Sequence, residues 1–107
     1  MKGIFCIVWT KDGIQNLTKA QWYKFNTKKL HRLNGPAVEQ ANGSKFWFVN
    51  GKIHRLDGPA AEWSKGSKQW WVCGKRLDNK DIEQWLKDNK VDLKEPEGQM
   101  AFKLRWM

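Results

Sequence analysis

The two histidines are the residues whose type and spacing first suggest chemistry. His31 and His54 each open a copy of the motif HRL(N/D)GPA, at residues 31–37 and 54–60. Two histidines could act as base and acid in a metal-independent ribonuclease. Catalysis requires unlike environments that separate two pKa values, whereas equivalent places in a repeated motif favour one structural role for both residues. The sequence therefore predicts no catalytic residue, and we expect the protein not to be an enzyme.

Other site chemistries have no support in the sequence. The chain has two cysteines, Cys6 and Cys73, and no His or Cys cluster has metal-ligand spacing. No nucleophile elbow and no phosphate-binding loop occurs. We expect no metal and no cofactor, and we expect no disulfide because such bonds are rare in reducing compartments.

The histidine motif lies within a longer segment that occurs twice. Residues 31–52 align with residues 54–75 without a gap, and 14 of the 22 positions are identical. A partial third copy, with insertions, precedes them at residues 22–30. Self-similarity at a fixed period is typical of repeat architectures.

Each copy of the segment has the pattern of a β-hairpin. Two runs suited to strands, residues 37–41 and 45–49 in the first copy and 60–64 and 68–72 in the second, are separated by Gly-containing turns. The motif between hairpins is predicted to be a structural turn, formed by His31, Gly35, Pro36, His54, Asp57, Gly58 and Pro59. Residues 4–9 should form a further strand that is covered on both faces.

The pattern changes after Leu77. Asp78 or Asn79 can cap a helix over residues 78–89, which should cover the last hydrophobic face of the sheet. The final segment, residues 90–107, should dock as either a strand or a helix. Nearer the start, Thr18 and Gln21 could form a helix capping box, but the alignment of the partial copy favours a strand at residues 22–25.

Together these patterns predict a mainly β protein of the α+β class. We expect one domain over residues 1–107, with an antiparallel β-hairpin repeat or meander sheet and one C-terminal capping helix. Its parts are an N-terminal strand and connector (1–21), the hairpin repeats (22–77), the capping helix (78–89) and the docking segment (90–107). No apolar run is long enough to span a membrane.

Basic residues dominate the first part of the chain. Residues 1–76 hold 14 Lys and Arg against 4 Asp and Glu, whereas residues 77–107 hold 6 against 7, within a net charge of +9. A field of one sign favours polyanions, and cations beside aromatic rings suit single-stranded nucleic acid, RNA more than DNA. The candidate binding residues are Lys28, Lys29, Arg32, Lys45, Trp47, Lys52, Arg55, Lys68, Trp70, Trp71, Lys75 and Arg76. Arg32 and Arg55 could instead form internal ion pairs, and the sequence leaves both alternatives open.

The repeated segment resembles a known group of short phage proteins. HRLNGPAVE and HRLDGPAAE, followed by GSKFWFVNGK and GSKQWWVCGK, are similar to the tandem H-R-x-D-G-P-A-x-E units of tailed bacteriophages, which resemble MORN-type hairpin repeats. The resemblance covers about residues 22–77 and implies a phage-encoded accessory protein in the host bacterial cytoplasm. Asn34 stands where Asp is usual, Cys73 where Asn is usual, and Leu77-Asp78 where a third His-Arg would fall.

Three functional hypotheses follow from the charge and the resemblance. The first is a non-enzymatic accessory protein that acts against a host defence or host-takeover target by binding nucleic acid through a basic, aromatic β-surface. The second is a direct inhibitor of an acidic host protein, and the third is a module for anionic lipid or a scaffold. Exposed sheet edges also leave a homodimer open.

Overall fold

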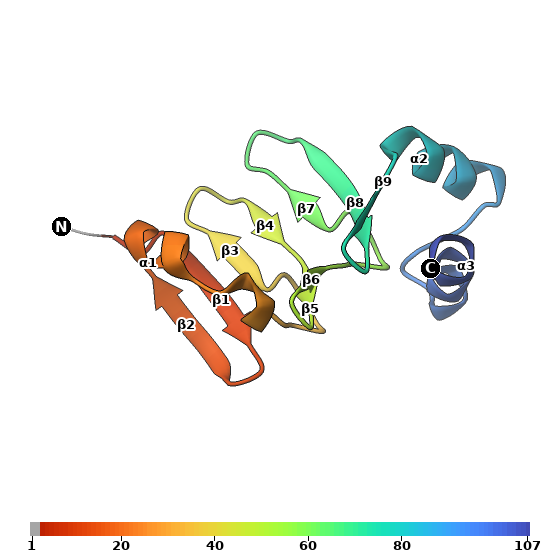
Figure 1. The fold of residues 1–107 in the computed structure, drawn as a ribbon. Coiled ribbons are helices and arrows are strands. Elements are labelled where there is room, and N and C mark those ends of the chain that lie inside the picture. Colours follow the sequence, from red (N-terminus) through yellow and green to blue (C-terminus); the bar gives the residue numbers. More distant parts are fainter. Residues whose placement is uncertain (1–2) are drawn as a thin grey trace.

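The computed structural model describes residues 3–107, which form an antiparallel sheet of seven strands (Figure 1). In spatial order the strands are β2 (Gly13–Leu17), β1 (Cys6–Thr10), β3 (Val38–Gln40), β4 (Lys45–Phe46), β7 (Ala61–Glu62), β8 (Lys68–Val72) and β9 (Lys75–Leu77). A second, two-stranded sheet pairs β5 (Phe48–Val49) with β6 (Lys52–Ile53). The predicted antiparallel sheet with meander segments is confirmed.

Helices lie at both ends of this sheet. Helix α1 (Lys19–Lys24) and the 3-10 helix η1 (Thr27–Lys29) lie over the β1 end, whereas α2 (Asn79–Asp88) and α3 (Pro96–Trp106) lie beyond β9 (Figure 1). The described chain is elongated, with extents of 50 × 29 × 21 Å. The predicted capping helix is present as α2, and α1 and η1 are additional helices that the predicted fold did not include.

Helix α1 replaces the strand predicted at residues 22–25. The Thr18 hydroxyl accepts a hydrogen bond from the Gln21 N–H (3.3 Å), and the Gln21 side chain accepts one from the Thr18 N–H (2.8 Å). This capping box satisfies two N–H groups that a helix otherwise leaves free. The strand prediction was wrong because the capping box at Thr18 and Gln21 starts a helix here. The alignment that favoured a strand contained inserted residues, so it did not establish the local structure of residues 22–25.

The C-terminal helices follow their own capping signals. The Asp78 carboxylate accepts hydrogen bonds from the N–H groups of Lys80 and Asp81 (2.8 and 3.1 Å), as predicted for the start of α2. Pro96 occupies the first turn of α3, where its missing N–H costs nothing. The open choice between strand and helix for the final segment is resolved as a helix.

The hydrophobic core has two parts, one at each end of the sheet. The first contains Cys6, Val8, Leu17, Leu30, Ala37 and Val38, with Trp22 and Phe25 from the α1–η1 region packed against it. The second contains Trp70, Val72, Leu77, Ile82, Leu93 and Phe102. The terminal helices therefore supply the apolar cover for both ends of the sheet. Within residues 3–107, no helix is both long enough and apolar enough to cross a membrane.

Candidate nucleic-acid interface

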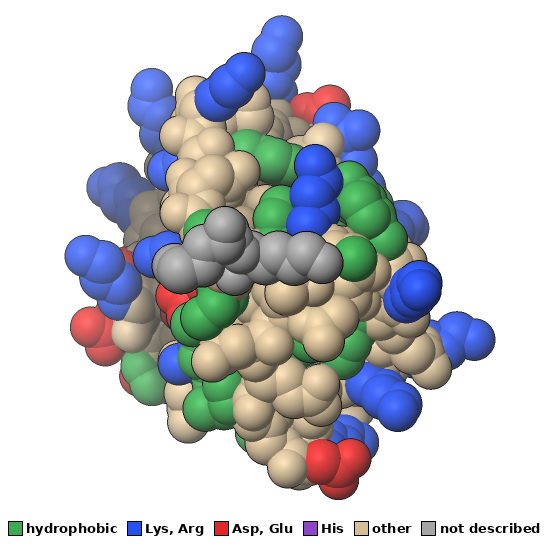
Figure 2. Space-filling view, turned by 90° about the vertical axis from the view of Figure 1, so that its left-hand side faces the viewer, with side chains coloured by type: hydrophobic (Ala, Val, Ile, Leu, Met, Phe, Trp, Pro, Cys, Tyr) green, Lys and Arg blue, Asp and Glu red, His purple; other side chains and the backbone are tan. Residues whose placement is uncertain are grey.

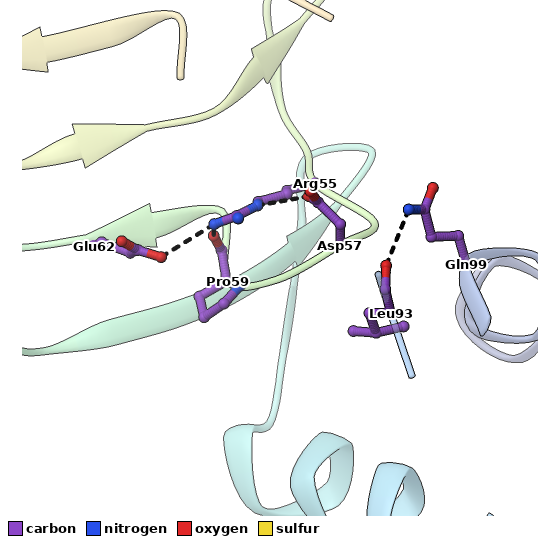
Figure 3. Close-up of polar contacts among 6 residues, drawn as sticks. All are labelled: Arg55, Asp57, Pro59, Glu62, Leu93 and Gln99. Carbon is purple, nitrogen blue, oxygen red and sulfur yellow. Dashed lines mark hydrogen bonds and ion pairs between the residues drawn. The ribbon is translucent and has the colours of Figure 1, made fainter. Parts of the chain in front are cut away.

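Arg55 is held by contacts within the protein. Its guanidinium lies over the Trp47 ring, with Cζ 3.9 Å from the ring centroid. Nη1 donates to the Pro59 carbonyl (2.9 Å) and to the Glu62 carboxylate (3.1 Å), while Nε donates to Asp57 (2.7 Å; Figure 3). Only 19% of the Arg55 side chain is exposed. These contacts use three of the five N–H groups of the guanidinium, those on Nε and Nη1.

Arg32 makes the same set of contacts in a weaker form. Its Cζ lies 4.0 Å from the Trp9 ring centroid, and Nη1 donates to the Pro36 carbonyl (3.0 Å). The Arg32–Glu39 ion pair is longer, at 3.8 Å. Asn34, which stands where Asp57 stands in the second copy, carries no charge. Of the two alternatives for the arginines, the structure places both in internal contacts.

The glycines of the motif make room for these arginines. A Cβ at Gly35 would lie 2.9 Å from the Arg32 Cζ, and a Cβ at Gly58 would lie 2.8 Å from the Arg55 Cζ. Real Cβ atoms do not come this close to another carbon, so a side chain here would displace the guanidinium. The turn residues of HRL(N/D)GPA thus serve the scaffold.

Each histidine supports a neighbouring turn. The Nδ1 atom of His31 accepts a hydrogen bond from the Asn50 N–H, and that of His54 accepts one from the Cys73 N–H, both at 2.9 Å. Nδ1 can accept only while it carries no proton, so the neutral imidazole is required. Burial, followed by the nearby charge of Lys103, lowers the pKa of His54 and favours this neutral form. The two histidines therefore share one structural role.

Trp70 was predicted to contact a ligand, but it is buried. Arg32 and Arg55 each stack on a tryptophan, and the same pattern would place a third arginine at position 78. That position holds Asp78, the N-cap of α2, so no arginine of the motif covers Trp70. Phe102 of α3 packs on Trp70, with ring centroids 5.7 Å apart, and 7% of Trp70 is exposed. This prediction is corrected because a helix distant in sequence covers the ring. Trp47, half-buried beneath Arg55, likewise presents little free surface.

Lys45 and Lys68 are exposed, but acidic residues lie beside them. The strand register places Lys45 opposite Glu39 on one side and Glu62 on the other, and it places Lys68 opposite Glu62. Opposite charges at such cross-strand positions attract each other and lower the local field. The middle of this sheet face is therefore less basic than its sequence suggests.

The remaining cations form a group that we call the lysine stripe. It consists of Lys28, Lys29, Lys52, Lys75 and Arg76, all exposed. Backbone hydrogen bonds from Gly51 to Leu30 (2.8 Å) and from Gly74 to Ile53 (2.9 Å) set η1, the β5–β6 turn and the β8–β9 turn side by side. Lys28 therefore lies against Gly51, the neighbour of Lys52, and Lys52 lies against Gly74, the neighbour of Lys75.

The lysine stripe is free of internal partners in the described structure. All three ion pairs found within residues 3–107 involve Arg32 or Arg55. In the end-on view of Figure 2, which shows the N-terminal end, Lys and Arg side chains project around the margin and outnumber the acidic ones. The stripe therefore presents uncompensated positive charge.

Trp71 is the predicted aromatic residue that lies beside the lysine stripe. It pairs with Arg76 in the β8–β9 register, so both side chains lie on one face of the sheet. The Trp71 ring is half-buried, and its Nε1 donates to the Gln69 side chain (3.1 Å). Its orientation is thereby fixed next to a cation.

Sequence reasoning missed Trp63. It lies on a cleft of about 490 Å³ between the β3–β4 and β7–β8 turns, with Gln40, Asn42, Ser44, Lys65 and Gln69 also in the lining. Trp63 is 38% exposed, and its ring meets Phe46 edge-on, with centroids 5.5 Å apart. The available signal was the alignment itself, because Trp63 falls where the first copy has Gln40.

A second concavity, of about 600 Å³, lies between the two motif turns and α3. Arg32, Arg55 and His54 line it, but each already bonds within the protein. Gln99 reaches it from α3 and donates to the Leu93 carbonyl (3.0 Å; Figure 3). This groove therefore offers fewer free polar groups than its lining suggests.

The two cysteines and the acidic residues form neither a disulfide nor a metal site within residues 3–107. Cys6 is buried, which raises the pKa of its thiol, and Cys73 is exposed; both are free. Among residues 3–107, no group of three or more His, Cys, Asp or Glu side chains is placed to hold a metal ion.

The chain matches no protein-family model, and no curated protein and no solved structure matches it.

Proposed function

We propose that the protein is a non-enzymatic binding protein. It binds nucleic acid along the lysine stripe, with RNA preferred to DNA. The observation that carries this proposal is the set of exposed cations on adjoining turns, none of which forms an ion pair within residues 3–107. Phosphate groups require such charge, and Trp71 adds an aromatic face beside it.

The proposal includes a repeat architecture for residues 31–52 and 54–75. In both copies an arginine stacks on a tryptophan from earlier in the chain, and the Nδ1 atom of a histidine accepts a hydrogen bond from a later turn. These matched contacts support two equivalent units, which would place one lysine of the stripe at each turn. We further propose that the protein is a phage accessory protein directed at a host defence or host-takeover target, as the sequence resemblance implies.

Salt dependence tests the binding proposal. A labelled, unstructured RNA oligonucleotide and its DNA counterpart would be titrated with the full chain at about 50 mM salt and above, with fluorescence anisotropy as the readout. We expect log affinity to fall linearly with log salt, with a slope of about −0.7 for each single-strand phosphate contact. The Lys52→Gln/Lys75→Gln variant removes two such contacts, so we expect its slope to be less negative by about 1.4.

A matched control separates the lysine stripe from general charge. The Lys45→Gln/Lys68→Gln variant removes the same charge from positions beside Glu39 and Glu62, so its slope should change less. Equal effects of the two variants would refute the assignment to the stripe. No binding of either oligonucleotide at about 50 mM salt would refute nucleic-acid binding. A host protein retained on the chain after nuclease treatment would then favour the protein-inhibitor hypothesis.

A further inference from the structure

The cleft beside Trp63 is formed by the β3–β4 and β7–β8 turns. These neighbouring turns lie at the opposite ends of the strands from the β5–β6 and β8–β9 turns (Figure 1). The Ser64 N–H donates to the Ser44 hydroxyl (3.0 Å), and Ser44 is 1% exposed. This bond joins the two turns directly. The walls of the cleft are therefore fixed relative to each other before any ligand arrives.

The scaffold does not require tryptophan at position 63. In the second turn, Trp63 donates to the Ser67 carbonyl and accepts from the Gly66 N–H, both at 2.9 Å. In the first turn, Gln40 makes the same two bonds with Ser44 and Gly43, also at 2.9 Å. Glutamine thus supports the same backbone geometry. A large, partly exposed aromatic ring at this place needs a reason other than the turn.

An edge-on contact with Phe46 fixes the orientation of the Trp63 ring. Phe46 contacts it at an interplanar angle of 76°, so Phe46 buttresses the ring from the side. Edge-on contacts of this kind are favourable and orient the ring. The exposed part of the indole can therefore receive a flat molecule with little loss of side-chain entropy.

The rest of the lining is suited to a neutral planar group that forms hydrogen bonds. Amide and hydroxyl side chains surround Trp63, Lys65 supplies one cation, and none of the described residues that line the cleft is acidic. The Gln69 oxygen already accepts from Trp71, which leaves its amide N–H groups to donate. Asn and Gln side chains can hydrogen-bond base edges, and unpaired bases stack on aromatic rings.

The cleft is also connected to the lysine stripe. Gln69 and Trp71 lie on the same face of β8, two residues and roughly 7 Å apart, and Arg76 of the stripe lies beside Trp71. A strand held by its phosphates at the stripe can therefore run along β8 and reach the cleft.

We propose that this cleft takes an unpaired nucleobase stacked on Trp63, so that the protein selects single-stranded over double-stranded nucleic acid. The inference rests on the proposed function, because the lysine stripe supplies the sequence-independent phosphate contacts. Bases in a duplex are stacked on one another, and they cannot enter the cleft without being unpaired.

The test compares Trp63→Gln with the wild-type chain. Labelled single-stranded and hairpin-duplex RNA would be titrated with each protein at about 50 mM salt. We expect Trp63→Gln to weaken single-strand binding about 5- to 150-fold, the range of a lost base–aromatic stack. Duplex binding and the salt slope should change little. Gln40 in the first turn indicates that the variant folds, and far-ultraviolet circular dichroism would check this.

A control variant and a second probe make the result specific. Tyr23→Gln removes another exposed aromatic ring, on α1 and away from the cleft, and it should leave both affinities unchanged. Nucleoside monophosphate should quench Trp63 fluorescence in the wild type relative to Trp63→Gln, whereas a neutral monosaccharide should not. Quenching by the sugar alone would overturn the nucleobase assignment.

The possible outcomes separate this inference from the proposed function. If the wild type binds RNA but Trp63→Gln binds single strands equally well, the cleft assignment is wrong while binding at the lysine stripe stands. If Trp63→Gln weakens single-strand and duplex binding to the same extent, strand selection by the cleft is wrong. If the wild type binds neither RNA, the proposed function fails and the cleft assignment fails with it.

Discussion

Replacing Gly51 by alanine should destabilise the protein more than the same change at Gly74. Both residues follow a turn residue with positive φ, and their own φ values are +78° and +80°. Their surroundings differ. A Cβ at Gly51 would lie 2.5 Å from the Lys28 carbonyl oxygen and 2.8 Å from the Lys28 Cα, whereas a Cβ at Gly74 would lie 3.8 Å from the Lys52 Cβ.

The expected loss of unfolding free energy can be worked out for each variant from these contacts. The left-handed conformation costs an L-residue about 1–2 kcal/mol, partly offset because alanine lowers the entropy of the unfolded chain. Gly74→Ala should therefore cost about 1 kcal/mol. Gly51→Ala adds an overlap with backbone atoms of η1, which cannot rotate away, and overpacking costs about 1–3 kcal/mol more. We expect about 2–4 kcal/mol in total.

Urea unfolding followed by tryptophan fluorescence would measure both free energies of unfolding. The same contact places Lys28 and Lys29 beside the β5–β6 turn, so Gly51→Ala should also weaken oligonucleotide binding more than Gly74→Ala does. Equal destabilisation by the two variants would refute the packing of η1 on that turn. It would also remove the basis for including Lys28 and Lys29 in the lysine stripe.

Three further predictions concern the contacts around the motif. Arg55→Lys should lower the free energy of unfolding by about 1–3 kcal/mol, because lysine cannot both stack on Trp47 and donate in a fork; urea unfolding would show this, and an unchanged midpoint would contradict it. Cys73→Asn should raise stability by about 0.5 kcal/mol, since Asn tolerates the φ of 51° better, and a lower melting temperature would count against this reasoning. The lowered pKa of His54 means that the unfolded chain binds more protons below about pH 6.5. Stability from this group should be complete above that pH and fall as the pH drops towards the lowered pKa, and His54→Gln should reduce the difference in unfolding free energy between about pH 7.5 and about pH 5.5.

Local signals predicted much of the sheet. Asn50-Gly51 and Cys73-Gly74 both form tight turns with positive φ. The run 68–72 is one strand, as predicted, but the predicted strand 45–49 is divided at Trp47 into β4 and β5, which belong to different sheets. Asp78 caps α2 as its position suggested. These features depend on residues close together in the sequence, so patterning alone identifies them.

Contacts between distant segments could not be predicted in this way. Trp70 is buried in a core to which α2 and α3 contribute Ile82 and Phe102, both distant from it in the sequence. Trp63 becomes part of a cleft because two hairpin turns meet, which depends on the pairing of β4 with β7. The lysine stripe was contained in a longer list of basic residues, and strand register was needed to separate it from lysines that face glutamates.

Several positions that are identical in the two segments hold the fold, and several that differ lie around the cleft beside Trp63. Identical positions include the histidine, arginine, glycine and glutamate whose contacts recur in both copies. Positions that differ include Gln40 against Trp63 and Phe46 against Gln69, and all four cluster around one cleft. Because the backbone bonds of the two turns are the same, these differences are not imposed by the turns themselves. Under the proposed function, the ligand would be recognised by these unlike residues and by Lys52 and Lys75, which are identical in the two segments and form no ion pair within residues 3–107.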